Sequence, residues 1–395
     1  MNTRARAVSK EGLYVHTLIL ATLLSMNAVT ACDGGSVDPI EALTLEPNPN
    51  TEATTDGDGG VVVQAHTACI YDVAFSPDGA QIATCGLDDA VRIWDSRSGQ
   101  YLRGFSNGRI VLAVSFSPDG RSLLVATIDH GIHMFDTATW KSSVVARTDG
   151  MPQAIVQSES GDSIAIGTDP IQLFRPTDFS QICVLRGHKL GGEALAFSSD
   201  GKTLVSGNAD QKAKVWDVEK QALRFERQHD YWVDSVDVSR DGKQIAISSF
   251  RRAPGSQTYE IAIVNSTSGA IEGALMGETL RGHAHSSTQI RYSPDGLLLV
   301  SLMQGLHATD DVRDDDDVTD DVGSISVWDA KTEALIARRT SNQRPYRLCI
   351  SRDSKRVAVT DVKGKLEIWK VASFIKENSV NKPGQAEPGV GADSR

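Results

Sequence analysis

The sequence predicts an all-β fold built from seven copies of one unit. A Ser-Pro-Asp-Gly turn and its variants recur along the 395 residues, and the fourth position of the turn falls at residues 79, 120, 161, 201, 242, 296 and 354. The spacing is 40 or 41 residues over the first four intervals and then lengthens to 54 and 58. A fixed period of this length is typical of repeat architectures, in which each copy packs against its neighbours.

Strands flank each turn, and the turn itself has the chemistry of a hairpin tip. Proline presets φ, the Asp side chain caps the turn, and glycine accepts a positive φ. Around the first turn, apolar side chains fall at every second position, which is typical of half-buried strands, over residues 70–75, 81–84 and 91–95. The last strand of a unit ends in Trp-Asp at 94–95, 216–217 and 328–329, with variants at 135–136, 174–175, 264–265 and 369–370.

These units resemble WD40 repeats, and the resemblance covers residues 61–371. It implies a single seven-bladed β-propeller, in which four-stranded blades surround a central channel. The composition fits a folded domain, because 40% of the residues are hydrophobic and 23% are charged. The formal charge of -11 argues against a nucleic-acid partner, since phosphate contacts need an excess of Lys and Arg.

The WD40 resemblance also implies a hydrogen-bonded tetrad within a blade: a His before the first strand, a Ser or Thr on the second, an Asp in the next turn, and the Trp. Two units contain all four residues, which are His66, Thr84, Asp88 and Trp94 in one and His188, Ser206, Asp210 and Trp216 in the other. A His beside an Asp and a hydroxyl also resembles a hydrolase triad. Because the set recurs at one phase in two units, we interpret it as a structural polar network.

A strand from the N-terminal side is expected to close the ring. Residues 61–64 precede the first unit at the phase that residues 101–105 occupy before the second. WD40 propellers complete their last blade with such a strand, which removes an exposed sheet edge. Residues 61–64 are therefore predicted to form the outer strand of the seventh blade, beside residues 366–369.

Residues 1–31 are predicted to be a cleaved signal peptide. Three basic residues precede an apolar stretch that is short for a membrane span, and small residues then lead to Cys32. This pattern resembles the lipobox of bacterial lipoproteins, which implies a lipid on Cys32. The alternatives are an ordinary signal cleaved near Ala31 and an uncleaved anchor helix.

All three alternatives export the protein, which we expect to be lipid-anchored in the bacterial cell envelope and to face the periplasm or the exterior. Asp33 leaves the choice between inner and outer membrane open. Residues 32–60 are rich in Pro, Thr, Asn and acidic side chains and predict a flexible linker. Residues 372–395 predict a similarly flexible tail.

Two insertions lengthen the fifth and sixth units between their second and third strands. The first contains Arg251 and Arg252, and the second, residues 309–322, contains eight Asp and one Arg. Both are expected on the face where each first strand begins. We interpret the acidic run as a solvated loop; the alternatives are a docking site for a basic partner and weak Ca²⁺ binding at Asp314, Asp315, Asp316 and Asp317.

Aromatic and Arg side chains near the starts of the first strands are candidates for partner binding, because such side chains dominate binding hot spots. With Arg251 and Arg252, the candidates are Arg109, Tyr231, Trp232, His285, Arg344 and Tyr346. For Tyr231 and Trp232 the alternative is packing between blades. Cys69 and Cys85 fall in the first and second strands of one unit and are expected to be buried free thiols, with a disulfide as the alternative.

The sequence contains no convincing motif for catalysis, a cofactor or a metal. Residues 201–203 (Gly-Lys-Thr) resemble the end of a phosphate-binding loop, but Ala196 stands where the first Gly of that loop is required. We therefore expect a non-catalytic, monomeric interaction scaffold without a cofactor, which binds a protein or peptide on its loop face. The alternative is a periplasmic ligand-binding or Ca²⁺-binding sensor, or an enzyme, that uses the channel mouth.

Overall fold

The computed structural model describes residues 43–44, 52–55, 60–106, 108–189, 194–253, 256–280, 288–304, 323–341 and 344–380. At residues 43–44, 250–253, 256–259, 276–280, 288 and 341 the description is limited to the backbone. The signal-peptide region, Cys32, His285 and the Asp-rich insertion, with Asp314 to Asp317, lie outside these residues.

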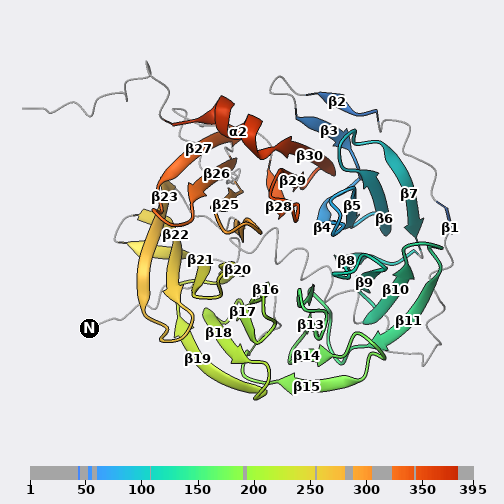
Figure 1. The fold of residues 1–395 in the computed structure, drawn as a ribbon, viewed down its shortest axis with the longest axis horizontal. Helices are drawn as coiled ribbons and strands as arrows, with labels where there is room; N and C mark the ends of the chain where they lie inside the picture. The colour runs from blue at the N-terminus through green and yellow to red at the C-terminus, as the bar shows by residue number, and fades with distance from the viewer. Residues whose placement is uncertain are drawn as a thin grey trace, which may run out of the picture.

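Seven antiparallel sheets stand around a central channel as the blades of a propeller (Figure 1). Blades 1 to 3 contain β4 (Ile70–Phe75), β5 (Gln81–Gly86), β6 (Ala90–Asp95) and β7 (Tyr101–Ser106); β8 (Val111–Phe116), β9 (Ser122–Thr127), β10 (Gly131–Asp136) and β11 (Ser142–Arg147); and β12 (Ala154–Gln157), β13 (Ile164–Gly167), β14 (Ile171–Phe174) and β15 (Gln181–Leu185).

Blades 4 to 6 contain β16 (Ala194–Phe197), β17 (Thr203–Gly207), β18 (Lys212–Asp217) and β19 (Ala222–Gln228); β20 (Val233–Val238), β21 (Gln244–Ala253), β22 (Ser256–Asn265) and β23 (Ile271–Leu280); and β24 (Thr288–Tyr292), β25 (Leu298–Met303), β26 (Gly323–Asp329) and β27 (Leu335–Ser341). Blade 7 contains β28 (Pro345–Ile350), β29 (Arg356–Asp361), β30 (Lys365–Lys370) and β3 (Val61–Gln64). The predicted all-β, seven-bladed fold is confirmed.

The repeated turn adopts the predicted hairpin geometry. In blade 1, Ser76 Oγ donates to Asp78 Oδ1 over 2.6 Å, and Gly79 has a φ of 68°. The turn ends the inner strand, which runs along the channel. Each inner strand begins on the opposite face of the ring, which also carries the turns between second and third strands, and we call this the entry face.

Apolar clusters fill the spaces between neighbouring blades. Ile93 and Phe105 of blade 1 meet Phe116, Leu123 and Phe135 of blade 2 in one cluster, and all five side chains are buried. The rings of Phe105 and Phe135 lie 4.9 Å apart. Apolar side chains of neighbouring blades therefore pack against each other, and this packing holds the inner strands in place around the channel.

The strand Val61–Gln64 closes the ring as predicted. It pairs antiparallel with β30 in the register Val61↔Ile368 to Gln64↔Lys365. The linker prediction for residues 32–60 is wrong at two short strands. β1 (Leu43–Thr44) pairs with the outer strand β7 of blade 1, and β2 (Thr54–Thr55) pairs with β3. Both add a fifth strand to a blade edge, because an outer strand still presents hydrogen-bonding backbone groups.

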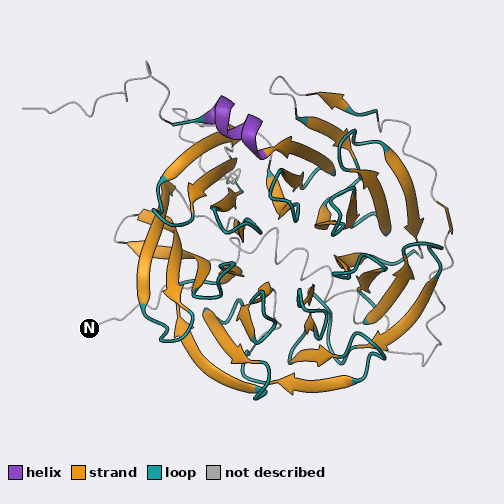
Figure 2. Ribbon diagram, in the orientation of Figure 1, coloured by secondary structure: helices purple, strands orange, loops and turns teal. Residues whose placement is uncertain are grey.

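The prediction of a flexible tail from residue 372 is also wrong over its first residues. Helix α2 (Val371–Asn378) follows β30 directly and lies against blade 6 (Figure 2). Phe374 is 5% exposed, and its ring centroid is 5.4 Å from that of Trp369. Val371, Phe374 and Ile375 are spaced to form one apolar helix face, which blade edges bury.

The insertion of blade 5 extends the blade rather than its turn. β21, β22 and β23 each have ten residues, and the backbones of Arg251 and Arg252 pair with Thr258 and Gln257. The prediction that these residues lie between the second and third strands is wrong, because both arms of the insertion continue the strand pairing. Among the described residues no helix is long and apolar enough to cross a membrane.

Candidate functional site

The tetrad of blade 1 is assembled from the loop before β4, the strands β5 and β6, and the turn between them. His66 Nδ1 lies 2.7 Å from Asp88 Oδ1, and His66 Nε2 lies 2.7 Å from Thr84 Oγ1. Trp94 Nε1 donates to the same Thr84 hydroxyl over 2.9 Å. Arg92 Nη1 adds an ion pair to Asp88 Oδ2 at 2.7 Å. These hydrogen bonds thus join the four side chains of the tetrad that the WD40 resemblance implies.

The tetrad of blade 4 repeats this geometry. His188 Nδ1 lies 3.0 Å from Asp210 Oδ2, His188 Nε2 lies 2.8 Å from Ser206 Oγ, and Trp216 Nε1 donates to Ser206 Oγ over 2.8 Å. Ser206 is fully buried, as Thr84 is in blade 1. A hydroxyl that solvent does not reach cannot attack a substrate, so the arrangement acts as a structural network rather than as a hydrolase triad.

Burial sets the protonation of these networks. Burial lowers the pKa of His66 below its usual value, and the hydrogen bond and charge of Asp88 offset this only in part. The pKa of His188 is lowered for the same reason. Burial raises the pKa of Asp88, but the hydrogen bond and charge of His66 and the charge of Arg92 together hold it well below the usual range. The resulting state is a neutral His66 beside an ionised Asp88 in blade 1, and a neutral His188 in blade 4.

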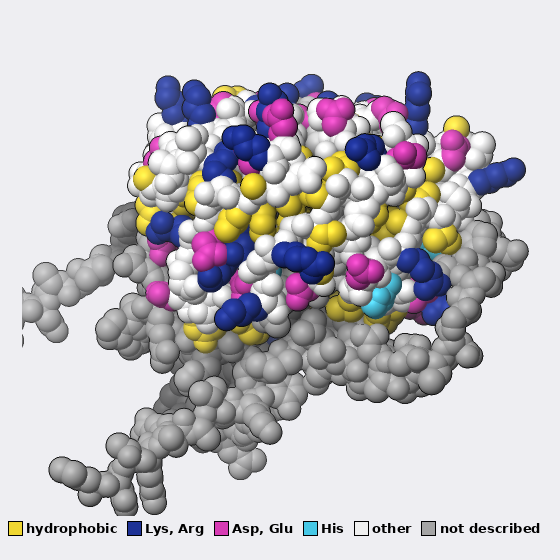
Figure 3. Space-filling view, turned by 90° about the horizontal axis from the view of Figure 1, so that it is seen from below, with side chains coloured by type: hydrophobic (Ala, Val, Ile, Leu, Met, Phe, Trp, Pro, Cys, Tyr) yellow, Lys and Arg dark blue, Asp and Glu magenta, His cyan; other side chains and the backbone are white. Residues whose placement is uncertain are grey.

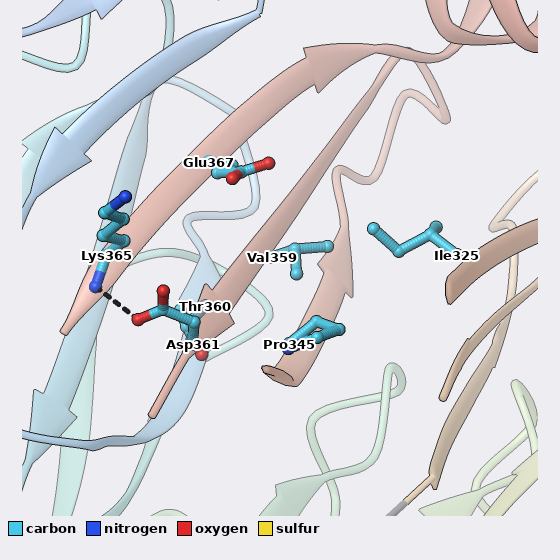
Figure 4. A pocket seen from close by; sticks show the side chains of 7 residues that line it. All are labelled: Ile325, Pro345, Val359, Thr360, Asp361, Lys365 and Glu367. Carbon is cyan, nitrogen blue, oxygen red and sulfur yellow. Dashed lines mark hydrogen bonds between the residues drawn. The ribbon is translucent and has the colours of Figure 1, made fainter. Parts of the chain in front are cut away.

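Blade 7 has the Trp of a tetrad without the hydroxyl, because Val359 stands at the strand position that Thr84 occupies in blade 1. Thr360 Oγ1 and Trp369 Nε1 are buried and have no partner among the described residues. A cavity of about 10 Å³, large enough for one water-sized group, adjoins Thr360 (Figure 4). Asp361 accepts the backbone N–H of Lys365 over 2.8 Å at its edge. The seventh blade therefore depends on apolar packing more than the first.

This difference between blades predicts unequal effects of one substitution. Trp94→Phe removes the donor to buried Thr84 and should lower the free energy of unfolding by about 1–2 kcal/mol more than Trp369→Phe, whose lost N–H has no partner. Urea denaturation of the two variants and the parent measures the difference. Equal losses would show that the tetrad hydrogen bond contributes nothing to stability.

The partner-binding candidates occupy different environments on the entry face. Arg109 is half exposed, and its Nε lies 3.2 Å from Asp129 Oδ2. Trp232 and Arg344 are half-buried, and burial lowers the pKa of Arg344. Tyr231 packs against the apolar cluster between blades 5 and 6, which is the alternative left open for it. For Arg251 and Arg252 the structure describes the backbone, which belongs to β21.

The prediction that Tyr346 contacts a partner is wrong. Its side chain is only 3% exposed and so is not available to a partner. It belongs to a buried cluster with Cys69, Tyr71 and Leu112 around the channel mouth. Its position just after the start of an inner strand turns the ring under the surface, against the neighbouring blade.

Four half-buried apolar side chains pack against this buried cluster and are not among the predicted site residues. They lie just before inner strands or just after second strands, and they are Ile110, Ile128, Met151 and Val362. Together with Cys69, Tyr71, Leu112 and Tyr346 we call them the mouth cluster. In the sequence each of them is an apolar residue beside a strand end. The sequence alone does not distinguish such a residue from a core residue.

The cysteine pair is not a disulfide. Cys69 and Cys85 are both buried and free. Burial raises the pKa of the Cys69 thiol to about 12, so it is protonated and unreactive at neutral pH. In the described part of the chain no three His, Cys, Asp or Glu side chains are grouped to hold a metal ion.

Comparison with known proteins identifies the repeats. The family model for the WD domain, G-beta repeat, matches residues 59–95, 98–136 and 179–217. These segments correspond to blades 1, 2 and 4, and two of them carry the tetrads.

The chain is also similar to parts of larger proteins. It is 25% identical to apoptotic protease-activating factor 1 of Rattus norvegicus over 47% of this chain and 15% of that protein. It is 27% identical to a periodic tryptophan protein 2 homolog of Dictyostelium discoideum over 47% of this chain and 21% of that protein. It is 25% identical to mitochondrial division protein 1 of Aspergillus clavatus over 40% of this chain and 23% of that protein. The match thus spans less than a quarter of each relative. The chain is a seven-bladed, all-β propeller that contains WD40 repeats.

Proposed function

We propose that this protein is an exported, membrane-tethered, non-catalytic scaffold that binds a protein or peptide on its entry face. The observation that carries the proposal is the mouth cluster, where four half-buried apolar side chains from the loops of blades 7, 2 and 3 lie together on the entry face. Such a surface, apolar at its centre and bordered by Arg109 and Arg344, has the composition of a binding hot spot. The matched repeats support the same function, since a rigid ring presents many loops at once.

The outer rim of the ring has a different character. Over the outer strands β15 and β19, charged side chains of both signs are mixed with apolar ones (Figure 3). Leu223 on β19 is 43% exposed among such neighbours. A single exposed apolar side chain on a mixed surface is ordinary, so the rim provides a control surface for binding experiments.

The partner-binding prediction is tested by crosslinking in native membranes. Trp232→Ala and Arg344→Ala should each reduce recovery of the crosslinked partner at least fivefold and change the melting temperature little, because both side chains are only half-buried. Leu223→Ala is the matched rim control and should retain the partner. A large fall in melting temperature would show instead that Trp232 and Arg344 are core residues, and a partner retained by all three variants would contradict the proposed face.

The tether is tested separately. A lipid on Cys32 should keep the protein in the membrane fraction, and Cys32→Ser should release it to the soluble fraction or leave the signal uncleaved. Mass spectrometry of the mature N-terminus checks the modification directly. A mature chain that begins elsewhere and carries no lipid would overturn the membrane attachment without affecting the proposed binding face.

A further inference from the structure

The channel wall contains one ring of residues whose chemistry changes halfway around. These residues lie four positions before the turn serine on each inner strand. In blades 5, 6, 7 and 1 they are polar: Ser235, Gln289, Arg347 and Asp72. In blades 2, 3 and 4 they are alanines: Ala113, Ala154 and Ala194.

Each polar member of the ring bonds to the backbone of the next inner strand. The N–H groups of Val114, Ile290 and Leu348 donate to Asp72 Oδ2 over 3.0 Å, to Ser235 Oγ over 3.2 Å and to Gln289 Oε1 over 2.7 Å, respectively. Arg347 Nε donates to the Tyr71 carbonyl over 2.8 Å. Backbone groups on the channel edge of an inner strand are therefore satisfied by the ring residue of the preceding blade.

The alanine half of the ring provides no such acceptor. In blade 3, Ser158 N donates to Ser163 O, and Ile155 pairs opposite Ile166, so the N–H of Ile155 points away from β13 and toward the channel. The same register turns the N–H of Leu195 in blade 4 toward the channel. In the described part of the chain no side chain accepts from either group. Donors that face the channel in this way are satisfied by water or by a ligand.

A cavity opens at this gap. It has a volume of about 170 Å³, and its walls include Ile155, Leu195, Ala154 and Ala194 on one side and Ser235, Gln289, Arg291 and Arg347 on the other. It is many times larger than the cavity beside Thr360, which has room for one water-sized group, and it has room for a small molecule. One wall is thus small and apolar and the other polar, as in sites that bind small molecules.

The cavity wall carries two carboxylates, Asp72 and Asp234, and two guanidinium groups, Arg291 and Arg347. Asp72 already accepts the N–H groups of Val73 and Val114, over 2.9 and 3.0 Å. Arg291 Nη1 donates to Ser235 Oγ and to the Ile290 carbonyl, over 3.2 and 2.7 Å, which uses one nitrogen of a guanidinium that carries donors on three. The Asp72 carboxylate is thus engaged by the backbone, whereas Arg291 carries donors on two further nitrogens.

We propose that this cavity binds the carboxylate of a small organic acid. The carboxylate accepts from the N–H groups of Ile155 and Leu195, as Asp72 accepts from Val114, and Arg291 and Arg347 attract it from the opposite wall. The ligand takes the place of the side-chain acceptors that Ala113 and Ala154 do not provide for Ile155 and Leu195. This site lies within the channel and is independent of the binding of a partner on the entry face.

The test is isothermal titration of the full chain with acetate, lactate, succinate, glycine and glutamate. At least one acid should bind with 1:1 stoichiometry and a Kd of about 1 mM or below, and its uncharged amide should not bind. Ala154→Asp supplies the missing acceptor for Leu195 within the protein, so it should weaken binding at least tenfold while the melting temperature stays equal or rises. Ala138→Asp makes the same substitution at an exposed turn and should bind like the parent.

Arg291→Gln provides a second variant in case Ala154→Asp does not fold, and it should also weaken binding at least tenfold. A short peptide with a free C-terminus, beside its C-terminal amide, distinguishes the source of the carboxylate: binding of the acid form alone, with no response to the free acids, would assign the site to a chain end. No binding of any carboxylate at 10 mM, or binding unchanged in both variants, would overturn the proposal.

Discussion

A chain that begins at residue 66 should lose its cooperative unfolding transition and aggregate. Such a truncation removes β3, which pairs with β30 through all four of its residues. It exposes the edge of β30 and opens the cluster in which Val63 and Ala65 pack between blades 7 and 1. Burial of Val63 alone contributes about 1.5–3 kcal/mol, a large part of the 5–15 kcal/mol that stabilises a typical domain. Urea denaturation followed by Trp fluorescence measures the transition.

A second truncation separates the closing strand from everything before it. A chain that begins at Gly60 retains Val61–Gln64 and lacks only the short strands Leu43–Thr44 and Thr54–Thr55. It should unfold cooperatively, with a midpoint close to that of the full chain, because each lost strand has two residues. If the chain that begins at residue 66 unfolds at the same midpoint, β3 does not hold the ring closed.

The closing strand could be predicted from the sequence because its position follows from the repeat phase. The tetrads were accessible for the same reason, since His66 and His188 stand at one phase before their inner strands. Phase also explains the error at Tyr346: a residue near the start of an inner strand was assigned to the surface, whereas its ring is 3% exposed. Period fixes the place of a residue along a blade, and packing with the neighbouring blade decides how deep its side chain lies.

Features outside the repeat had no such guide. Helix α2 was missed because the Pro and Gly residues beyond position 380 dominate the composition of the tail, although Val371, Phe374 and Ile375 have helical spacing. The alanine gap in the channel needed the structure, because Ala113, Ala154 and Ala194 are unremarkable in sequence. Their meaning depends on which backbone N–H groups the register turns toward the channel.

The free energy of unfolding should fall as the pH drops below 6.5. Burial lowers the pKa of four histidines, to about 4 for His229, where Nε2 is buried without a partner among the described residues; the other three are His66, His133 and His188. Above pH 6.5 these groups are neutral in both states, so their contribution to stability is fully present. Below it the unfolded chain binds protons that the folded chain does not, and stability is lost until the pH passes the folded pKa.

A single substitution isolates the contribution of His229. At about 1.4 kcal/mol per pH unit, His229 should account for a loss of about 2 kcal/mol between pH 6.5 and 5. His229→Gln removes the titrating ring, so urea denaturation across this range should show a loss smaller than that of the parent by this amount. Burial raises the pKa of Asp72 and Asp237, which acts in the opposite direction, but both proteins share that effect. Parallel pH profiles for the parent and His229→Gln would mean that the His229 ring is protonated as easily in the folded protein as in the unfolded chain.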